Sequence, residues 1–126
     1  MVVTTKYNEI HKKMVVWESI EKLAVIMIDV LSCIDEHEFK TRSQIINAHD
    51  SISSNFVEGY YSGYDKEFIR FLKYSRRSAA ELFDRVSGQF QRKVIGESLY
   101  ERFEERCVKT MYLLDRTKQW LENKNK

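Results

Sequence analysis

Apolar residues recur along this chain at spacings of three and four positions, the period of one face of an α-helix. The first stretch of this kind covers about residues 7–34, with its stripe formed by Ile10, Met14, Trp17, Ala24, Met27, Ile28 and Leu31. Further apolar residues lie beside that stripe, at Val16, Leu23, Ile26 and Val30. We therefore expect a first helix that is buried on more than one side.

A second helix is predicted after the polar connector DEHEFK. Thr41 or Ser43 is the expected N-cap, because a hydroxyl oxygen there accepts a hydrogen bond from a free backbone N–H group. The inward face is expected to consist of Ile45, Ala48, Ile52 and Phe56. Gly59 and Gly63 bracket the end of this helix, since glycine readily adopts the left-handed conformation that stops a helix.

Two more helices follow in the second half of the chain. Asp65 is the expected cap of the third helix, which runs to about Arg92. Gly96 marks the next corner, and Ser98 opens the fourth helix. The inward face of the fourth helix is predicted to contain Leu99, Phe103, Cys107, Met111, Leu114 and Leu121.

The fold class follows from these four segments. No stretch has the alternating pattern of a strand, and the chain contains no proline, so long helices can run without interruption. Short connections between helices force neighbours to pack antiparallel. We predict an all-α, antiparallel up-down-up-down four-helix bundle that forms a single domain over residues 1–126.

The third helix carries a row of basic residues opposite its apolar stripe. At ~100° per residue, the stripe falls within about 100° of arc; it consists of Phe68, Phe71, Leu72, Ser75, Ala79, Leu82, Val86 and Phe90. Lys66, Arg70, Lys73 and Arg77 lie on the far side, each within ~40° of the direction of Lys66, and Arg76 lies to one side of them. We call the first four residues the basic ridge, and we predict that they bind nucleic acid together with Arg76.

Charge is uneven along the chain. Residues 1–63 hold six basic and nine acidic residues, a net of −3, whereas residues 64–126 hold fifteen and ten, a net of +5. A ridge of lysine and arginine can bind phosphate backbones, and Tyr60, Tyr61 and Tyr64 beside it could stack on bases. The alternatives are a solvated helix face for the ridge and packing or subunit contacts for the tyrosines.

Other chemistry finds little support in the sequence. The segment GYYSG lacks the lysine and hydroxyl of a phosphate-binding P-loop, and no serine stands in a nucleophile-elbow motif. Cys33 and Cys107 are expected to be small core residues rather than a disulfide or metal pair, and no histidine has a second ligand at helical spacing. We expect no catalytic residue, no metal and no cofactor.

The cellular location is predicted from the apolar runs. None approaches the ~20 residues that a membrane-spanning helix needs, because Asp29 interrupts the longest one. Charged residues precede the first apolar run and no cleavage site follows it, so we expect no signal peptide, no membrane contact and a cytoplasmic location.

The end of the second helix contains a polar corner, Asn55, Glu58 and Gly59. Glu58 is expected to point inward and to hydrogen-bond Asn55 or Ser78, which would fix the helix register. Binding or catalysis at this carboxylate is the alternative.

The stretch SSNFVEGYYSGYDKEFIRFLKYSRRSAAEL resembles the four-helix bundle proteins encoded in intervening sequences of bacterial large-subunit ribosomal RNA genes. The shared motifs are Asn55-x-x-Glu58-Gly59, KEFIRFL from Lys66, and Ser78-x-x-Glu81-Leu82. The segments VWESIEKLAVIMIDV and TRSQIINAHDSISSN resemble the first and second helices of that family. A related branch is the accessory variability determinant of diversity-generating retroelements.

This resemblance implies a homopentameric bundle without enzyme activity, whose basic surface contacts RNA or DNA. The retroelement branch works beside a reverse transcriptase. The chain departs from the family where an Arg-Arg pair is usual, because Ile46 and Asn47 stand there, and where a proline is usual, because Ser53 stands there. Two hypotheses follow, a nucleic-acid-associated accessory protein acting through the basic ridge and a protein-interaction scaffold.

Overall fold

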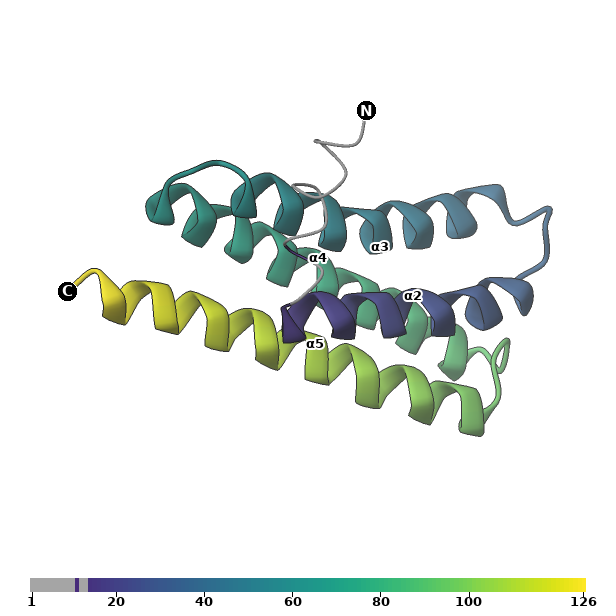
Figure 1. The fold of residues 1–126 in the computed structure, drawn as a ribbon. Helices are drawn as coiled ribbons and strands as arrows, with labels where there is room; N and C mark the ends of the chain where they lie inside the picture. The colour runs from purple at the N-terminus through teal and green to yellow at the C-terminus, as the bar shows by residue number, and fades with distance from the viewer. Residues whose placement is uncertain (1–10, 12–13) are drawn as a thin grey trace, which may run out of the picture.

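The computed structural model describes His11 and residues 14–126, and the described part of the chain contains four α-helices (Figure 1). They are α2 (Val15–Ser32), α3 (Phe39–Tyr60), α4 (Asp65–Gln91) and α5 (Glu97–Lys124). Consecutive helices run in opposite directions and are joined by short connections (Figure 1). The predicted all-α, antiparallel four-helix bundle is confirmed. No helix in the described part is long and apolar enough to cross a membrane.

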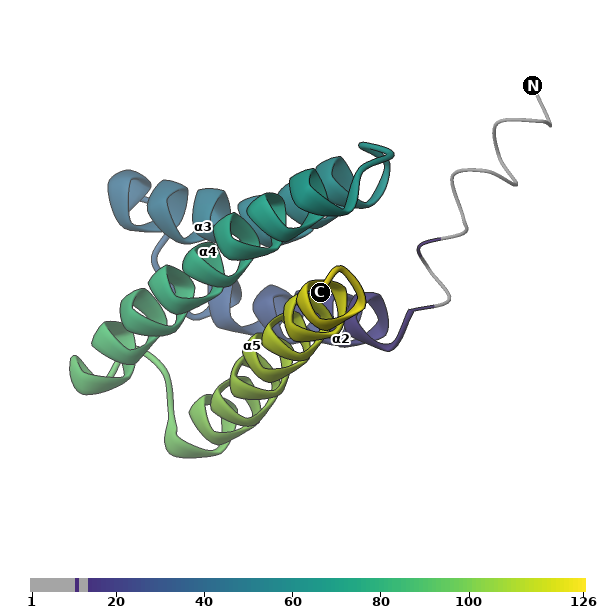
Figure 2. The same cartoon turned by 90° about the vertical axis from the view of Figure 1, so that its left-hand side faces the viewer.

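The four helices form a ring in which each packs against its neighbours in sequence and α5 returns to α2. The α3–α4 contact is the most extensive, followed by α4–α5 and α2–α5, while α2 and α3 contact each other least. The end-on view shows α3 lying along α4 and α2 lying along α5 (Figure 2). Helix α2 therefore packs mainly on α5, and the loosest contact between neighbouring helices lies between α2 and α3.

The core lies between the inward stripes of all four helices. Predicted inward residues of α3, Ile45, Ala48, Ile52 and Phe56, are buried. On α4 the same holds for Phe68, Leu72, Ser75, Ala79, Leu82 and Val86, while Phe71 and Phe90 are half-buried at its edges. The periodicity of the apolar residues therefore predicted the core faces of α3 and α4 correctly. On α2 the predicted stripe is partly wrong, because Ile28 is exposed while Val16, Leu23 and Val30, which were placed beside the stripe, are buried.

Buried hydroxyl groups are satisfied inside this core. Ser75 Oγ donates to the backbone carbonyl of Ile52, 2.7 Å away, and so ties α4 to α3. Ser19 Oγ and Thr110 Oγ1 lie 2.8 Å apart and link α2 to α5. Because a buried polar group without a partner is costly, these bonds favour one register between the paired helices.

The predicted starts of the second, third and fourth helices are wrong by one to five residues. Helix α3 begins at Phe39, so Thr41 and Ser43 lie inside it and do not cap it. The guanidinium of Arg42 donates to the carbonyls of Leu31 and Ile34, at 2.6 and 3.0 Å, and covers the C-terminus of α2. This contact requires the first turn of α3 to lie beside the end of α2, which accounts for the early start.

The caps expected for the third and fourth helices also differ from the structure. Tyr64 is the N-cap of α4, and Asp65 is its first helical residue. The Asp65 carboxylate accepts a hydrogen bond from Asn125 at 3.0 Å and pairs with Lys124 at 3.2 Å. It therefore joins the start of α4 to the end of α5. Gly96 caps α5, which starts one residue before Ser98.

The two glycines at the end of α3 have different roles. Gly63 has a φ of +86° and takes the left-handed conformation in the turn, as predicted. Helix α3 ends at Tyr60, so the two glycines bracket its end as predicted, but Gly59 is itself helical and does not stop the helix. A Cβ atom at Gly59 would lie 2.7 Å from Cβ of Phe71, so the missing side chain allows α3 and α4 to approach closely.

The two cysteines differ in burial. Cys107 is fully buried, as expected, and burial raises the pKa of its thiol to about 12. Cys33 is exposed, so its prediction as a core residue is wrong. It follows the last turn of α2, where the Arg42 guanidinium covers the helix carbonyls. The two thiols form no disulfide with each other.

Candidate nucleic-acid interface

The basic ridge lies on the outer face of α4. Lys66, Arg70, Lys73 and Arg77 are all exposed, as expected for residues opposite the buried stripe. They follow one another at about one helical turn, or ~5.4 Å of axial rise. The ridge therefore presents a line of four cations to solvent.

The four ridge residues differ in whether they form an ion pair within the bundle. Arg70 forms an ion pair with Glu67 at 2.6 Å and donates to the hydroxyl of Tyr74 at 3.3 Å. These contacts raise the pKa of Arg70, and the Arg70 hydrogen bond lowers the pKa of Glu67. Within the described residues, Lys66, Lys73 and Arg77 have no ion-pair partner. Three of the four ridge cations thus keep an uncommitted charge.

Aromatic rings lie against the arginines of the ridge. The Arg70 guanidinium carbon is 4.8 Å from the ring centre of Phe71 and 5.6 Å from that of Tyr74. The Arg77 guanidinium carbon lies 5.7 Å from the centre of the same Tyr74 ring. Such cation–π contacts hold long side chains in place. Tyr64, which precedes the ridge, is exposed.

Arg76 is held apart from the ridge. Its guanidinium lies 3.2 Å from the Asp115 carboxylate on α5, and both side chains are partly exposed. The structure thus directs Arg76 toward the α4–α5 seam, where its charge is partly neutralised.

The polar corner differs from the prediction at Glu58. Glu58 is exposed, so the expectation of an inward carboxylate bonded to Asn55 or Ser78 is wrong. Asn55 instead donates to the carbonyl of Ser51, 2.8 Å away. Gly59 occupies the core side of this turn, and the preceding residue therefore points about 100° away from the core.

An open hollow lies between this corner and the ridge, with a volume of about 510 Å³. Residues from the end of α3 and the start of α4 line it: Val57, Glu58, Tyr61, Ser62, Glu67, Arg70 and Phe71. Glu58 of the polar corner and Arg70 of the basic ridge, two features predicted separately, thus line the same hollow.

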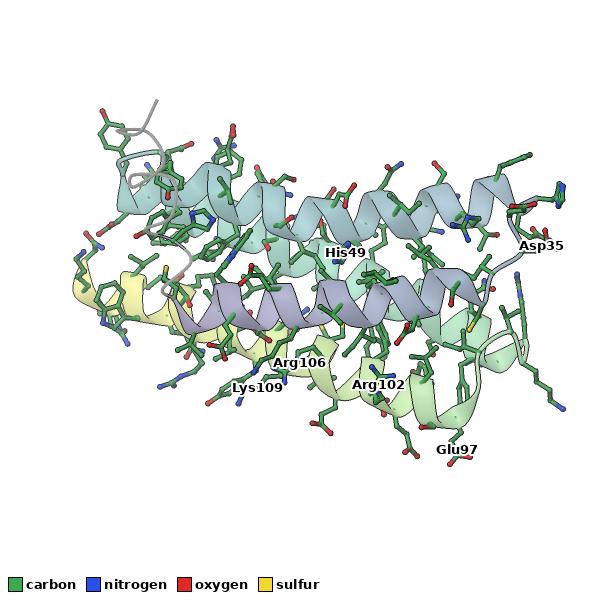
Figure 3. The ribbon with its side chains drawn as sticks, turned by 45° about the vertical axis from the view of Figure 1, so that its right-hand side comes forward. Asp35, His49, Glu97, Arg102, Arg106 and Lys109 are labelled. Carbon is green, nitrogen blue, oxygen red and sulfur yellow. The ribbon has the colours of Figure 1, made fainter. Side chains whose placement is uncertain are left out.

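A second basic row on α5 was missed in the sequence analysis. Arg102, Arg106 and Lys109 lie along α5 beside α2 (Figure 3). Arg102 lies 3.6 Å from Asp29 of α2, and Arg106 donates to Ser19 Oγ at 3.3 Å. The spacing of i, i+4 and i+7 equals that of the ridge and could have revealed this row.

Exposed apolar side chains concentrate on α2 and α5. On α2 they include Val15, Val25 and Ile28, each more than 60% exposed. On α5 they are Val108, Tyr112 and Trp120. The outer side of the first helix is therefore exposed in the single chain, so the expectation that this helix is buried on more than one side is not met within one bundle.

Metal-site geometry is absent from the described residues: no group of three or more His, Cys, Asp or Glu side chains is placed to hold an ion. His37 stands beside Asp35, whose carboxylate accepts the His37 backbone N–H at 2.7 Å. His49 lies in the part of α3 that faces α2, and burial lowers the pKa of its imidazole. His11 lies 2.8 Å from the Tyr61 hydroxyl through Nδ1.

A family of known proteins matches most of this chain. Residues 12–116 match the family described as 23S rRNA-intervening sequence protein. No curated protein and no solved structure matches the chain. The matched segment contains α2, α3, α4 and most of α5, and so covers the ridge and the polar corner. The chain belongs to the 23S rRNA-intervening sequence protein family.

Proposed function

We propose that this protein is a non-enzymatic, homo-oligomeric accessory protein of the cytoplasm that binds the backbone of RNA or DNA through the basic ridge of α4. The observation that carries the proposal is the ridge itself, four exposed cations in line, three of them without an ion-pair partner among the described residues. The family description, which refers to ribosomal RNA, is consistent with such a role.

Physical chemistry favours weak sequence preference at this surface. Lysine and arginine attract phosphates without reading bases, and the released counterions drive binding. The α5 row of Arg102, Arg106 and Lys109 adds positive charge on another side of the molecule. Arg102 is partly neutralised by Asp29, so we assign the main contact to the α4 ridge.

Self-association would multiply the effect of each ridge. The family resemblance suggests five copies, and the exposed Val25 and Ile28 of α2 offer apolar surface for contact between them. A ring that repeats the ridge gains avidity, because binding at one subunit raises the effective concentration of nucleic acid at the next.

The test is fluorescence anisotropy with a structured RNA and a duplex DNA at two salt concentrations. We expect affinity to fall with salt, with a logarithmic slope of about −0.9 for each contacting cation on duplex DNA and about −0.7 on single strands. The variant Arg70→Glu/Arg77→Glu should lose binding and remain folded, because both side chains are exposed.

A matched control changes charge away from the ridge. Arg92→Glu/Lys93→Glu, at the exposed turn after α4, reverses the same number of charges and should keep most of the affinity. Absence of binding by the native protein at low salt contradicts the proposal. Binding that survives the ridge reversal but not the reversal Arg102→Glu/Lys109→Glu moves the contact to α5.

A protein-interaction scaffold is the second candidate function, favoured by the exposed apolar residues of α2 and α5. Val108, Tyr112 and Trp120 on α5 could receive a protein partner, such as a reverse transcriptase, even where no nucleic acid is bound. Specific capture of a protein that depends on Tyr112 and Trp120, together with unmeasurable nucleic-acid affinity, would favour this function.

A further inference from the structure

The hollow between α3 and α4 has the features of a site for a single planar group. Its volume of about 510 Å³ falls in the range of ~300–1,000 Å³ that is usual for small-ligand sites. The Arg70 side chain of the ridge lines one side of it, so a strand lying on the ridge passes its mouth. The close approach at Gly59 fixes the two helices at this point.

Phe71 and Arg70 together provide a stacking surface beside the hollow. The Phe71 ring is half-buried, and the Arg70 guanidinium lies 4.8 Å from its centre. Arg70 is itself fixed by its 2.6 Å ion pair with Glu67. Unpaired bases stack on aromatic rings and on guanidinium planes in single-strand-binding proteins.

Glu58 is the polar group of the hollow whose role the bundle does not explain. It is exposed and has no hydrogen-bond or ion-pair partner within the described residues, whereas the other carboxylate, Glu67, is occupied by Arg70. A carboxylate repels phosphate, so beside a phosphate-binding ridge it favours a ligand with hydrogen-bond donors. Among the bases, guanine offers two adjacent donors, N1–H and the 2-amino group, which match the two oxygens of one carboxylate.

We propose that this hollow binds one unpaired guanine of a strand held on the basic ridge, with Glu58 accepting its two donors and Phe71 and Arg70 stacking on it. This inference rests on the proposed nucleic-acid function and adds a base preference to it. The ridge supplies affinity for the backbone, and the hollow supplies selectivity for one base.

The experiment measures anisotropy of labelled single-stranded oligouridine carrying one central G, A, C or U, at one fixed salt concentration. We expect the strand with G to bind about tenfold more tightly than the others, the order of discrimination that a bidentate contact provides. In Glu58→Gln the advantage of G should largely disappear, while binding of plain oligouridine stays equal or rises. Phe71→Leu should weaken all four strands together.

Glu104→Gln is the matched control, because it removes the same charge from an exposed carboxylate on the distant half of α5. It should leave the preference for G unchanged. Equal binding of the four strands, or a G preference that Glu58→Gln does not alter, overturns the inference and leaves the proposed function intact. If no single strand binds the native protein at low salt, this inference fails, and the proposed function fails with it only where structured RNA and duplex DNA do not bind either.

Discussion

At the scale of single residues, Gly59 controls how closely α3 and α4 approach each other. Its position would bring a Cβ atom to 2.7 Å from Phe71 Cβ and to 3.2 Å from Phe68 Cα. One of these neighbours is backbone and the other is the first side-chain atom, so neither can move by a simple rotamer change. The glycine is therefore required for packing and not for turning the chain.

We predict that Gly59→Ala lowers the free energy of unfolding by about 1–3 kcal/mol, the usual cost of adding a methyl group to a close-packed contact. Urea denaturation followed by circular dichroism measures this change. Gly88→Ala is the matched control, because Gly88 also lies inside a helix but has open space at its Cβ position. It should be neutral or stabilise by up to about 1 kcal/mol. Equal effects of the two substitutions would contradict the role given to Gly59.

At the scale of elements, predictions that depended on the pattern of a single helix mostly succeeded, whereas features that depend on contacts between helices were missed. The inward faces of α3, α4 and α5 were predictable because periodic apolar residues must meet in a core. The inward face of α2 was not, because apolar residues lie on both its inner and its outer side. The start of α3 was not predictable, because the Arg42 guanidinium there donates to backbone carbonyls of Leu31 and Ile34. A contact with the end of the preceding helix cannot be read from the local sequence pattern. The same limit applies to Arg76, whose partner Asp115 lies 39 positions away.

At the same scale, the candidate site was predicted in part. The ridge is exposed as expected because its spacing places it opposite the stripe. The predicted inward position of Glu58 was wrong, because Gly59 is the residue that faces the core there. Glycine has no apolar side chain, so the pattern of apolar residues did not reveal that this position faces inward. The hollow combines residues from two helices, so it could be seen only once the α3–α4 packing was known.

The free energy of unfolding should depend on pH, because the imidazole of His49 on α3 is partly buried. Burial lowers the pKa of His49 in the folded protein from the ordinary value of 6.5, and Asp50 only partly opposes this. The unfolded chain therefore takes up a proton at a higher pH than the folded chain does. The contribution of neutral His49 to the free energy of unfolding is fully present above about pH 6.5. It is lost as the pH falls below that value, until His49 of the folded protein is protonated as well.

Urea melts at pH 7.5 and at pH 5.5 test this expectation. Native protein should lose more stability between the two pH values than His49→Gln, which cannot be protonated. His37→Gln is the control, because His37 is exposed and its removal should leave the pH dependence almost unchanged. A His49→Gln variant with the native pH dependence would show that the His49 imidazole is already open to water in the folded protein.

At the scale of the whole molecule, the outer face of α2 points to assembly. Val25 and Ile28 are 63% and 68% exposed, on a helix whose inward face is already filled. Large apolar side chains exposed three positions apart on one helix favour a contact with another molecule. In a closed ring of identical subunits, every subunit contacts two neighbours, so no subunit keeps such a surface exposed.

We expect light scattering at micromolar concentration to give a mass well above the 15.1 kDa of one chain, with five copies as the specific prediction. Val25→Glu/Ile28→Glu should shift the mass toward the monomer, because buried charges without partners would oppose the contact. Ser43→Glu/Ser54→Glu, two exposed polar positions of α3, is the matched control and should not change the mass. A native protein that scatters as a monomer would contradict the prediction.

The pairing of α2 with α5 also sets an order of events during synthesis. The bonds that join these helices connect residues as far as 91 positions apart, whereas α2 packs only lightly on α3, the helix that follows it. Helix α2 therefore leaves the ribosome early but meets its principal neighbour last. The helical hairpins α3–α4 and α4–α5 form from nearby contacts, and such contacts form fast. The inward face of an apolar helix thus stays uncovered while the three following helices are made, and uncovered apolar surface of this kind favours aggregation before folding is complete.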